Sequence, residues 1–487
     1  MSDRLHVGQT FIFAVALAFA VAGCSVLEPK RAWEQPPPSP IENPIVPAAD
    51  LHRSTLPNGL EVIVLEDTRL PRISQGFTLR RGAGSVDPTY AGVAELAAEV
   101  MQRGAGDRDA LALAKVVEDL GASLAVGSDW DTTDVAISGL SQDRRVLFEI
   151  LADVVRRPVF DAVEFSKARS EQQAAIVAAQ DDPATLIQWH ALETIYAGHR
   201  YGLPQSGTAE TIAAIDVERA RAYWEDRFVP RNAIFWAVGD FDAEELLAQV
   251  QREFGDLEDG PVPPGTPTPP TPTPDARRIV VVDKPDLVQA RIVVAHEGIS
   301  RTEPTRIAVD LMNDALGGSG FSSRLMQKIR SDEGLTYGVG SGFSLRGQPG
   351  PFSVSTFTRV PMVRRVVDLI LAELEAIQGD EPIREKELAK FVSYNVGRFG
   401  LSLETSGAVL ASLVDLDVHD LPDDALDTYR SRVRAITLED VESAAELRLH
   451  PERAAIIVLG PADALVPELE SLLDAGEGAG EIEVREP

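Results

Sequence analysis

Residues 92–101, Gly-Val-Ala-Glu-Leu-Ala-Ala-Glu-Val-Met, carry side chains at a spacing that could support metal chemistry. Their apolar residues recur at the spacing of one helical stripe, which predicts a helix with one buried face. Glu95, Ala98 and Glu99 share another face, at positions i, i+3 and i+4. Imidazoles at i and i+4 could bind zinc there, and a carboxylate at i+3 could take a proton from a zinc-bound water. In this chain, however, the imidazole positions hold carboxylates and the base position holds a methyl group.

Two glutamates on one helical turn are a poor zinc site, because zinc in proteins usually has three ligands with nitrogen or sulfur among them. The histidines supply no replacement, since no two of them are four residues apart; they are His6, His52, His190, His199, His296, His419 and His450. A solvated helix face is the simpler interpretation of Glu95 and Glu99, and an unusual carboxylate metal site is the alternative. We therefore expect no metal and no catalytic group in this chain alone.

A mixed set of strands and helices must position this helix. In the first block, strands are predicted at 61–65, 73–79, 123–126 and 134–140, and helices at 90–103, 109–120, 142–156, 161–179 and 184–196. In the second block, strands are predicted near 278–283, 287–296, 335–345 and 351–358, and helices near 303–316, 361–377, 383–402, 405–417 and 437–448. Strands and helices occur in runs and do not alternate strictly, which favours an α+β fold with helices packed on a largely antiparallel sheet.

The two blocks are of similar size and are separated by the proline-rich segment 260–276, which is typical of a semi-rigid linker. Pro230–Gly239 in the first block aligns with Pro451–Gly460 in the second, at an offset of 221 residues between positions 230 and 451. A charged helix precedes each segment, and another helix follows it, at 242–254 and at 462–473. Similar local order at one fixed offset predicts a duplicated domain.

The N-terminus resembles a bacterial lipoprotein signal. Arg4 lies in a short polar lead, residues 11–22 are apolar, and Val21-Ala22-Gly23-Cys24 places small residues before a cysteine, as a cleavage site requires. Cys24 is the only cysteine in the chain, so it is predicted to accept a lipid; an uncleaved signal anchor is the alternative. Ser25 is not the aspartate associated with retention at the inner membrane, so the periplasmic side of the outer membrane is the expected location. The predicted division of the chain is a signal peptide at 1–23, a proline-rich tether at 24–50, a first domain at 51–259, a linker at 260–276, a second domain at 277–475 and an acidic tail at 476–487.

Composition sets the outer limits on function. The chain has 487 residues, 44% of them hydrophobic and 25% charged, as in ordinary globular proteins of two or more domains. Its formal net charge of -30 argues against nucleic acid as a partner and favours solubility. A charge that is spread over the whole chain identifies no particular site.

Together these features resemble the pitrilysin/insulinase family of inverted-motif zinc peptidases, in the two-domain form shared with mitochondrial processing peptidase subunits. The resemblance covers residues 51–475 and rests on the helix at 92–101, Leu56-Pro57-Asn58-Gly59-Leu60, Asp181-Asp182-Pro183 and Tyr196-Ala197-Gly198-His199-Arg200-Tyr201-Gly202. Arg200 stands where the family usually has proline. The resemblance implies two homologous domains that together form half of a clamshell.

The family's third zinc ligand is a glutamate on a later helix. This chain has Glu171-Gln172-Gln173-Ala174-Ala175-Ile176 in that region, with alanines where the family usually has paired glutamates. Glu171 lies one helical turn away and is expected to be solvated. The resemblance therefore implies that all three ligands and the general base are missing.

The second block retains a family motif, Leu316–Arg330 followed by Glu333–Val339. Arg330 and Tyr337 match the family's arginine and tyrosine pair, which reaches the substrate beside the zinc of the other half. Such a pair can donate hydrogen bonds to a carbonyl oxygen that gains negative charge during attack. The alternative is that Arg330 pairs with an acidic neighbour, Asp332 or Glu333, and that Tyr337 packs in a strand.

The glycine-rich loop in this motif contains Gly317, Gly318 and Gly320. It lacks the lysine and the preceding strand of a phosphate-binding loop. In the family such a loop lies near the substrate, where small residues permit close approach of the backbone. We therefore expect these glycines to contribute to substrate binding.

The resemblance implies a non-catalytic, substrate-binding subunit of a heteromeric periplasmic zinc metallopeptidase. The expected partner is an insulinase-family chain that bears His-x-x-Glu-His, a third glutamate and the zinc ion, and the expected substrate is an unfolded peptide. A catalytically inert peptide-binding or scaffold lipoprotein of the cell envelope is the alternative. A self-sufficient zinc protease would need ligands that this chain lacks.

Overall fold

A computed structural model describes residues 45, 50–269, 277–474 and 482–487. The predictions for the signal peptide, for Cys24 and for most of the tether lie outside the described residues. Both predicted repeats belong to the single compact unit that begins at Val46.

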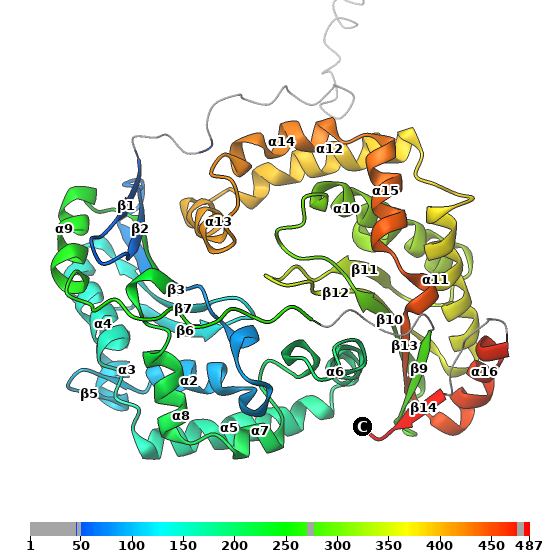
Figure 1. The fold of residues 1–487 in the computed structure, drawn as a ribbon, viewed down its shortest axis with the longest axis horizontal. Helices are drawn as coiled ribbons and strands as arrows, with labels where there is room; N and C mark the ends of the chain where they lie inside the picture. The colour runs from blue at the N-terminus through cyan, green and yellow to red at the C-terminus, as the bar shows by residue number, and fades with distance from the viewer. Residues whose placement is uncertain (1–44, 46–49, 270–276, 475–481) are drawn as a thin grey trace, which may run out of the picture. The chain divides into compact units, whose positions relative to one another are not determined.

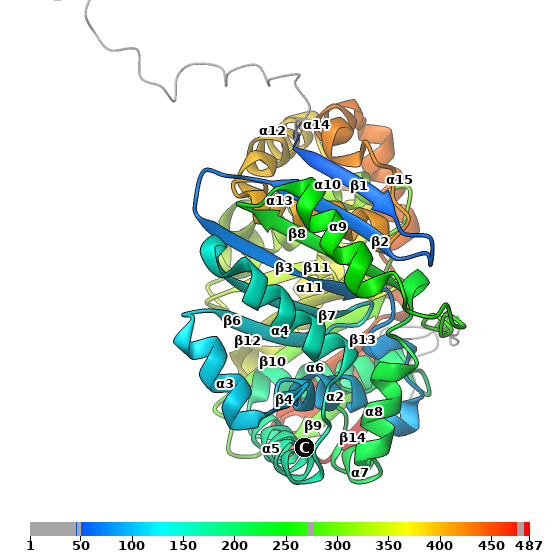
Figure 2. The ribbon, with the colours of Figure 1, turned by 90° about the vertical axis from the view of Figure 1, so that its left-hand side faces the viewer.

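The first repeat contains a six-stranded sheet, called here the N-terminal sheet (Figure 2). Its strand order is β1 (Leu51–Thr55), β2 (Glu61–Glu66), β8 (Ala233–Gly239), β3 (Arg72–Leu79), β7 (Thr133–Leu140) and β6 (Ser123–Ser128). Neighbouring strands pair antiparallel except β2 and β8, which are parallel. The prediction of a largely antiparallel sheet is therefore confirmed for this half.

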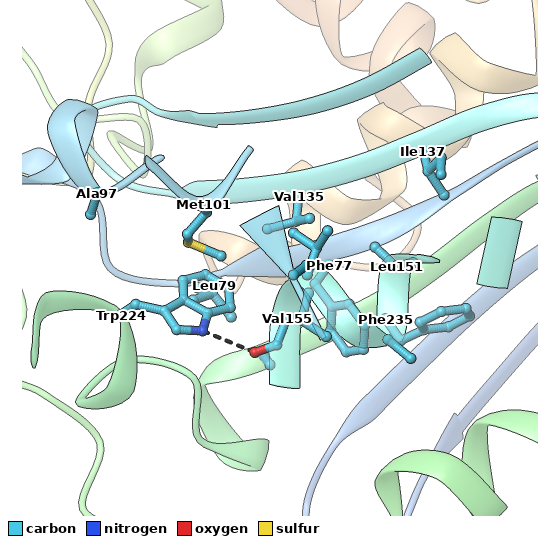
Figure 3. Packing of buried hydrophobic residues seen from close by; sticks show 14 of the residues in the cluster. Phe77, Leu79, Ala97, Met101, Val135, Ile137, Leu151, Val155, Trp224 and Phe235 are labelled. Carbon is cyan, nitrogen blue, oxygen red and sulfur yellow. Dashed lines mark hydrogen bonds between the residues drawn. The ribbon is translucent and has the colours of Figure 1, made fainter. Parts of the chain in front are cut away.

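Helices cover one face of the N-terminal sheet and bury its alternate side chains. These helices are α2 (Val93–Met101), α3 (Ala110–Asp119), α4 (Arg144–Arg156), α5 (Ala162–Gln180), α7 (Ala209–Ala213), α8 (Val217–Glu225) and α9 (Ala243–Phe254). Phe77 and Leu79 of β3 point into the core together with Phe235 of β8, as Figure 3 shows. The indole of Trp224 donates a hydrogen bond to the carbonyl of Val155 at 2.9 Å, so its one polar atom is satisfied inside this core.

The second repeat contains the C-terminal sheet, whose order is β11 (Val339–Phe343), β12 (Pro351–Arg359), β10 (Gln289–Glu297), β13 (Ala455–Gly460), β9 (Arg278–Asp283) and β14 (Ile482–Arg485). Its helices are α10 (Arg306–Asn313), α11 (Val363–Gln378), α12 (Glu385–Ser402), α14 (Ala425–Ala435), α15 (Leu438–Arg448) and α16 (Ala462–Asp474). The pairings from β11 to β13 are antiparallel, and those of β9 with β13 and β14 are parallel. The duplication predicted from the sequence is thus visible as two sheets of related strand order.

Three predicted elements differ from the structure. The strand predicted at 335–345 is shorter, because only Val339–Phe343 pairs with β12. The helix predicted at 303–316 changes at Asp314–Gly318 into a wider turn of the π type. Ile482–Arg485, predicted to be part of an acidic tail, forms strand β14 beside β9. In the C-terminal sheet β14 is the edge strand, in the place that β1 takes in the N-terminal sheet. Its charged residues made the alternating apolar residues Ile482 and Val484 difficult to recognise as a strand pattern in the sequence.

One helix from each repeat packs on the sheet of the other repeat (Figure 1). Helix α6 (Pro183–Ile195) follows α5 in the first repeat, but it packs on β10 and β13 of the C-terminal sheet. Helix α13 (Ser406–Val418) follows α12 in the second repeat, but it packs on β8 and β2 of the N-terminal sheet. Both helices were predicted within two residues of their bounds, whereas their partners were not predicted.

The segment Tyr196–Gly202, recognised above as a family feature, lies at a junction between the halves. The hydroxyl of Tyr196 donates to the carbonyl of Pro349 at 3.0 Å. The guanidinium of Arg346 lies 4.4 Å from the ring centre of Tyr201 and 4.2 Å from that of Trp130. These buried contacts tie the segment to the loop before β12, which gives it a structural role.

Within the described ranges, no single helix is long and apolar enough to cross a membrane, and only the bent pair α12 and α13, with 110° between its members, meets the length and hydropathy test jointly.

Candidate functional site

Helix α2 presents the three side chains that were predicted to share one face. It begins after Gly92, whose φ of 95° is one that glycine adopts most easily, and its apolar stripe is buried. The side chains of Glu95 and Glu99 are exposed, whereas Ala98 is only 3% exposed. Although the Glu95 side chain reaches solvent, protein atoms surround much of its carboxyl group; this partial desolvation, and secondly the Glu99 carboxylate, raise the pKa of Glu95.

Arg103 joins the end of α2 to α5. Its Nη2 atom lies 2.6 Å from Glu99 Oε1 and 2.5 Å from Glu171 Oε2, and its Nη1 atom lies 3.8 Å from Glu164 Oε2. Glu171 is solvent-exposed, as predicted, but it is also ion-paired, and its hydrogen bond from Arg103 lowers its pKa. The positively charged group that joins α2 to α5 is therefore the guanidinium of Arg103.

These residues do not fit a zinc ion. Glu99 is engaged by Arg103, the methyl group of Ala98 can neither bind a metal nor accept a proton, and Ala174 on α5 offers no ligand. In the parts of the chain that the structure describes, no three His, Cys, Asp or Glu side chains gather in a way that could hold a metal. Gln172 instead fastens α5 to α2, since its Nε2 donates to the carbonyl of Gly92 at 3.2 Å.

The retained pair in the second repeat has a different arrangement. The guanidinium carbon of Arg330 lies 4.5 Å from the ring centre of Tyr337 and 4.5 Å from that of Phe321. Both rings are largely exposed, Tyr337 at 75% and Phe321 at 70%. The three side chains, called here the aromatic–arginine cluster, therefore form a preorganised group on the surface of this chain.

The alternative interpretation of this pair is wrong. Glu333 is held by Arg365 at 2.5 Å, and Asp332 accepts a hydrogen bond from Gln327 at 3.1 Å. Tyr337 precedes β11 and faces solvent, so it does not pack as a strand residue. Within the described residues the guanidinium of Arg330 has no carboxylate partner, and its contacts are the two rings.

Arg330 lies in the π-type turn Met326–Asp332, which ion pairs to α11 and α12 hold in place. The ammonium of Lys328 lies 2.5 Å from the carboxylate of Glu373, a residue that is only 1% exposed. Arg324, just before the turn, forms a bidentate pair with Glu387 of α12, at 3.0 and 2.8 Å. Such wide turns occur frequently at functional sites, and here the turn fixes the base of the aromatic–arginine cluster.

The loop that carries Tyr337 is fastened to the neighbouring strand. Thr356 of β12 donates a hydrogen bond to the carbonyl of Gly338 at 2.8 Å, and Thr358 donates to the carbonyl of Leu335 at 2.6 Å. Tyr337 lies between these two anchors. Its ring is exposed on a short span of backbone that is held on both sides.

The glycines of the loop have local structural reasons to be glycine. A Cβ atom at Gly317 would lie 2.6 Å from the backbone nitrogen of Ser341 in β11, and one at Gly318 would lie 2.6 Å from the amide nitrogen of Asn313. Gly320 has φ of 65°, and a Cβ there would meet nothing within 4 Å. Gly317 is thus required by packing against backbone, and Gly320 is required by its backbone angle and faces open space, whereas at Gly318 the nearest atom is the end of the Asn313 side chain.

The structure therefore assembles two separate groups from the predicted residues. Glu99 is brought to Arg103 and Glu171, and Arg330 is brought to Tyr337; among the described residues no hydrogen bond, ion pair or ring contact links the two groups. Phe321 was part of the quoted motif but was not predicted to have a role. An aromatic residue directly after Gly320 was its only sequence signal.

Comparison with known proteins identifies the family of this fold. Residues 62–209 match the family model described as Insulinase (Peptidase family M16), and residues 214–393 match the model described as Peptidase M16 inactive domain. An uncharacterized zinc protease of Streptomyces coelicolor is 25% identical over 417 residues, which cover 84% of this chain and 90% of that protein.

Solved structures show the same fold. The peptidase M16 inactive domain from Pseudomonas fluorescens superposes with a TM-score of 0.77 and 26% identity, covering 85% of this chain and 98% of the other. The periplasmic protease PqqL of Escherichia coli superposes with a TM-score of 0.72 and 19% identity, covering 89% of this chain and 49% of the other. This chain is therefore a member of the insulinase/pitrilysin peptidase family that lacks the family's zinc motif.

Proposed function

We propose that this chain is the non-catalytic, substrate-binding subunit of a heteromeric zinc metallopeptidase. It supplies Arg330 and Tyr337 to a partner of the same family that bears His-x-x-Glu-His and holds the zinc ion. The observation that carries the proposal is the exposed aromatic–arginine cluster, which is preorganised in a chain whose α2 face cannot bind zinc. A chain of this kind can position a peptide but cannot activate water by itself.

The chemistry of the cluster suits a peptide carbonyl. The Arg330 guanidinium carbon lies 4.5 Å from each ring centre, and within the described residues no acceptor is hydrogen-bonded to its N–H groups, which leaves them available to a peptide. The Tyr337 hydroxyl provides one more donor on the exposed side. When a partner's nucleophile attacks a peptide bond, these donors could stabilise the carbonyl oxygen as it gains negative charge.

The comparisons support a non-catalytic role for this chain, and they do not bear on its location in the cell. One matching family model and one solved relative are described as inactive domains, and the relatives include chains named zinc proteases. The periplasmic location is proposed from the sequence, through lipid attachment at Cys24 on the periplasmic side of the outer membrane. A Cys24→Ser variant that remained firmly bound to membranes would contradict lipid attachment there.

Affinity purification of the tagged full-length chain from its native envelope tests the proposal directly. We expect a stoichiometric partner with an intact zinc motif, and peptidase activity that a chelator abolishes. Recovery of the chain alone, without activity or metal, would instead favour a peptide-binding or scaffold lipoprotein.

Tyr337→Phe separates catalytic from structural roles within the reconstituted complex. The variant keeps the ring over Arg330 and loses only one exposed hydroxyl, so assembly and stability are expected to stay unchanged. Loss of a donor to the developing oxyanion is expected to lower kcat about 10²- to 10³-fold. Tyr394→Phe is the matched control, because Tyr394 is also an exposed tyrosine, at 45%, near an arginine, Arg398. Equal activity of the two variants would remove Tyr337 from the mechanism.

A further inference from the structure

A cavity of about 1050 Å³ lies between helix α13 and the open face of the N-terminal sheet. Its sheet side includes Ser74, Thr78 and Trp236, and its helix side includes Leu410 and Val414. The volume is at the upper end of the range typical of small-molecule sites in proteins. None of the residues of the aromatic–arginine cluster lines it.

The equivalent contact in the other half is largely filled. Helix α6 covers the open face of the C-terminal sheet, and an apolar cluster closes the space between them. The cluster consists of Leu186, Ile187, Ala191, Val280, Val282, Val293, Ala295, Ala455, Ile457 and Leu459. A smaller pocket of about 300 Å³ remains where α6 begins, lined by Pro183, Arg291 and Phe357 among others. The same arrangement of helix on sheet thus leaves much less space in one half than in the other, so the fold does not require the larger cavity.

The side chains on the open face of the N-terminal sheet account for the difference. Alternate residues of β3 point away from the core, and the registers with β8 and β13 place Gly76 and Thr78 where β10 has Val293 and Ala295. Trp236 projects from β8 on the same side, and its indole donates to Thr78 Oγ1 at 3.1 Å. A polar wall with one large ring cannot close against α13 as the apolar face closes against α6.

The charge of the lining is negative. Six carboxylates and three arginines line the cavity. The carboxylates are those of Asp67, Asp129, Asp131, Asp134, Glu404 and Asp415, and the arginines are Arg69, Arg72 and Arg301. Two of the arginines are already paired, since Arg69 lies 2.7 Å from Asp67 and Arg301 binds Asp415.

Aspartates from the β6–β7 turn and the start of β7 carry much of this negative charge. Asp131 accepts the amide of Gly347 at 2.8 Å, and Asp134 accepts the hydroxyls of Thr78 at 2.5 Å and Thr132 at 2.6 Å. Burial raises the pKa of both Asp131 and Asp134. Within the described residues no lysine or arginine forms an ion pair with Asp131 or Asp134, although Arg346 and His419 lie near Asp131. A bound cation would offset the burial that disfavours the charged form of both carboxylates.

We propose that this cavity binds a small organic cation with an apolar body. An ammonium or guanidinium group would reach the carboxylates of Asp131 and Asp134, and the apolar part would lie against Trp236, Leu410 and Val414. An aromatic face beside the carboxylates favours a cation further. The proposal does not depend on the peptidase assembly proposed above, because the cavity belongs to this chain alone.

Isothermal titration calorimetry of the isolated chain with n-hexylammonium tests this site. Saturable one-to-one binding is expected, at least about tenfold tighter than that of 1-hexanol or hexanoate, because a charged hydrogen bond is lost with the alcohol and repulsion replaces it with the acid. Equal binding of the alcohol and the ammonium compound, or no saturable heat with the ammonium compound, would overturn the proposal.

Two variants locate the binding and guard against a folding artefact. Asp134→Asn keeps an acceptor for Thr78 and is expected to weaken hexylammonium binding about 10- to 100-fold, whereas Val414→Trp is expected to abolish it by filling the cavity. Asp119→Asn, at an exposed position on α3, is the matched control. Unchanged binding in a folded Asp134→Asn variant would refute the assignment.

A further titration distinguishes two kinds of ligand that carry the same ammonium group, namely peptides and free small amines. A lysine-containing pentapeptide, acetylated and amidated at its ends, presents the same ammonium group on a peptide. Binding comparable to that of hexylammonium would identify basic peptide side chains as the ligand class, and its absence beside hexylammonium binding would identify free small amines.

Discussion

Leu186→Ala tests whether a helix of the first repeat stabilises the sheet of the second. Leu186 lies on α6, is 2% exposed and belongs to the apolar cluster with strands of the C-terminal sheet. The substitution removes buried carbon atoms and leaves a cavity that the sheet cannot fill, because Val293 and Ile457 beneath it are held by pairing on both sides.

The expected cost is about 2–4 kcal/mol in the free energy of unfolding. Buried leucine to alanine changes cost about 2–5 kcal/mol, and the lower part of that range applies here because α6 is a single helix that can shift toward the sheet. The C-terminal half is expected to lose stability although the change lies in the first repeat.

Urea denaturation measures the total cost, and hydrogen exchange of the β10 and β13 amides shows where the loss occurs. Leu111→Ala is the matched control, because Leu111 is 79% exposed on α3 and its truncation is expected to stay within about 0.5 kcal/mol of zero. If Leu186→Ala costs no more than this control, or if exchange rises only in the N-terminal sheet, then α6 does not stabilise the C-terminal sheet.

Three further predictions follow from single contacts. Arg103→Met is expected to raise the pKa of Glu171, since the hydrogen bond from Arg103 lowers that pKa, and NMR titration of the carboxylate checks the direction. Gly317→Ala is expected to cost about 1–3 kcal/mol in urea denaturation, because the new methyl group would lie 2.6 Å from the Ser341 nitrogen; a neutral result would show that the turn is loosely packed. Burial raises the pKa of Asp310 to about 7, so the folded chain binds this proton more tightly than the unfolded chain does, and stability falls as pH rises from about 4 to about 7. Asp310→Asn is expected to reduce that decline in denaturation curves measured across this pH range, and an unchanged slope would contradict the burial of this carboxyl group.

Local patterns predicted most elements of the fold. The alternation in β3 and the helical stripe of α2 gave their positions within a few residues, because each reflects contact with one core. The sheet on which α6 packs could not be predicted in this way. Its apolar residues have helical spacing whichever sheet they cover, and only the long-range chain path decides between the two.

The candidate site was predictable only as far as its residue types. The loss of zinc ligands at Glu95, Ala98 and Glu99 is legible in the sequence, whereas the pairing of Arg103 with Glu171 joins residues 68 positions apart. Phe321 could not be assigned for the same reason, because its contact with Arg330 depends on the π-type turn between them. Ser74 and Thr78 lie on the same face of β3, and polar residues on that face indicated in the sequence that it is not packed like a core. The strand prediction did not use this information.

The Arg103 bridge has a consequence for any attempt to build a zinc site on α2. Histidines placed at 95 and 99 would face a fixed positive charge, since the Arg103 guanidinium lies 2.6 Å from the present carboxylate of Glu99. A divalent cation would be repelled by this group even if both imidazoles were present. Metal binding at this face therefore requires the removal of Arg103 together with new ligands on both helices. Arg103 therefore works against a zinc site on this face independently of the missing ligands.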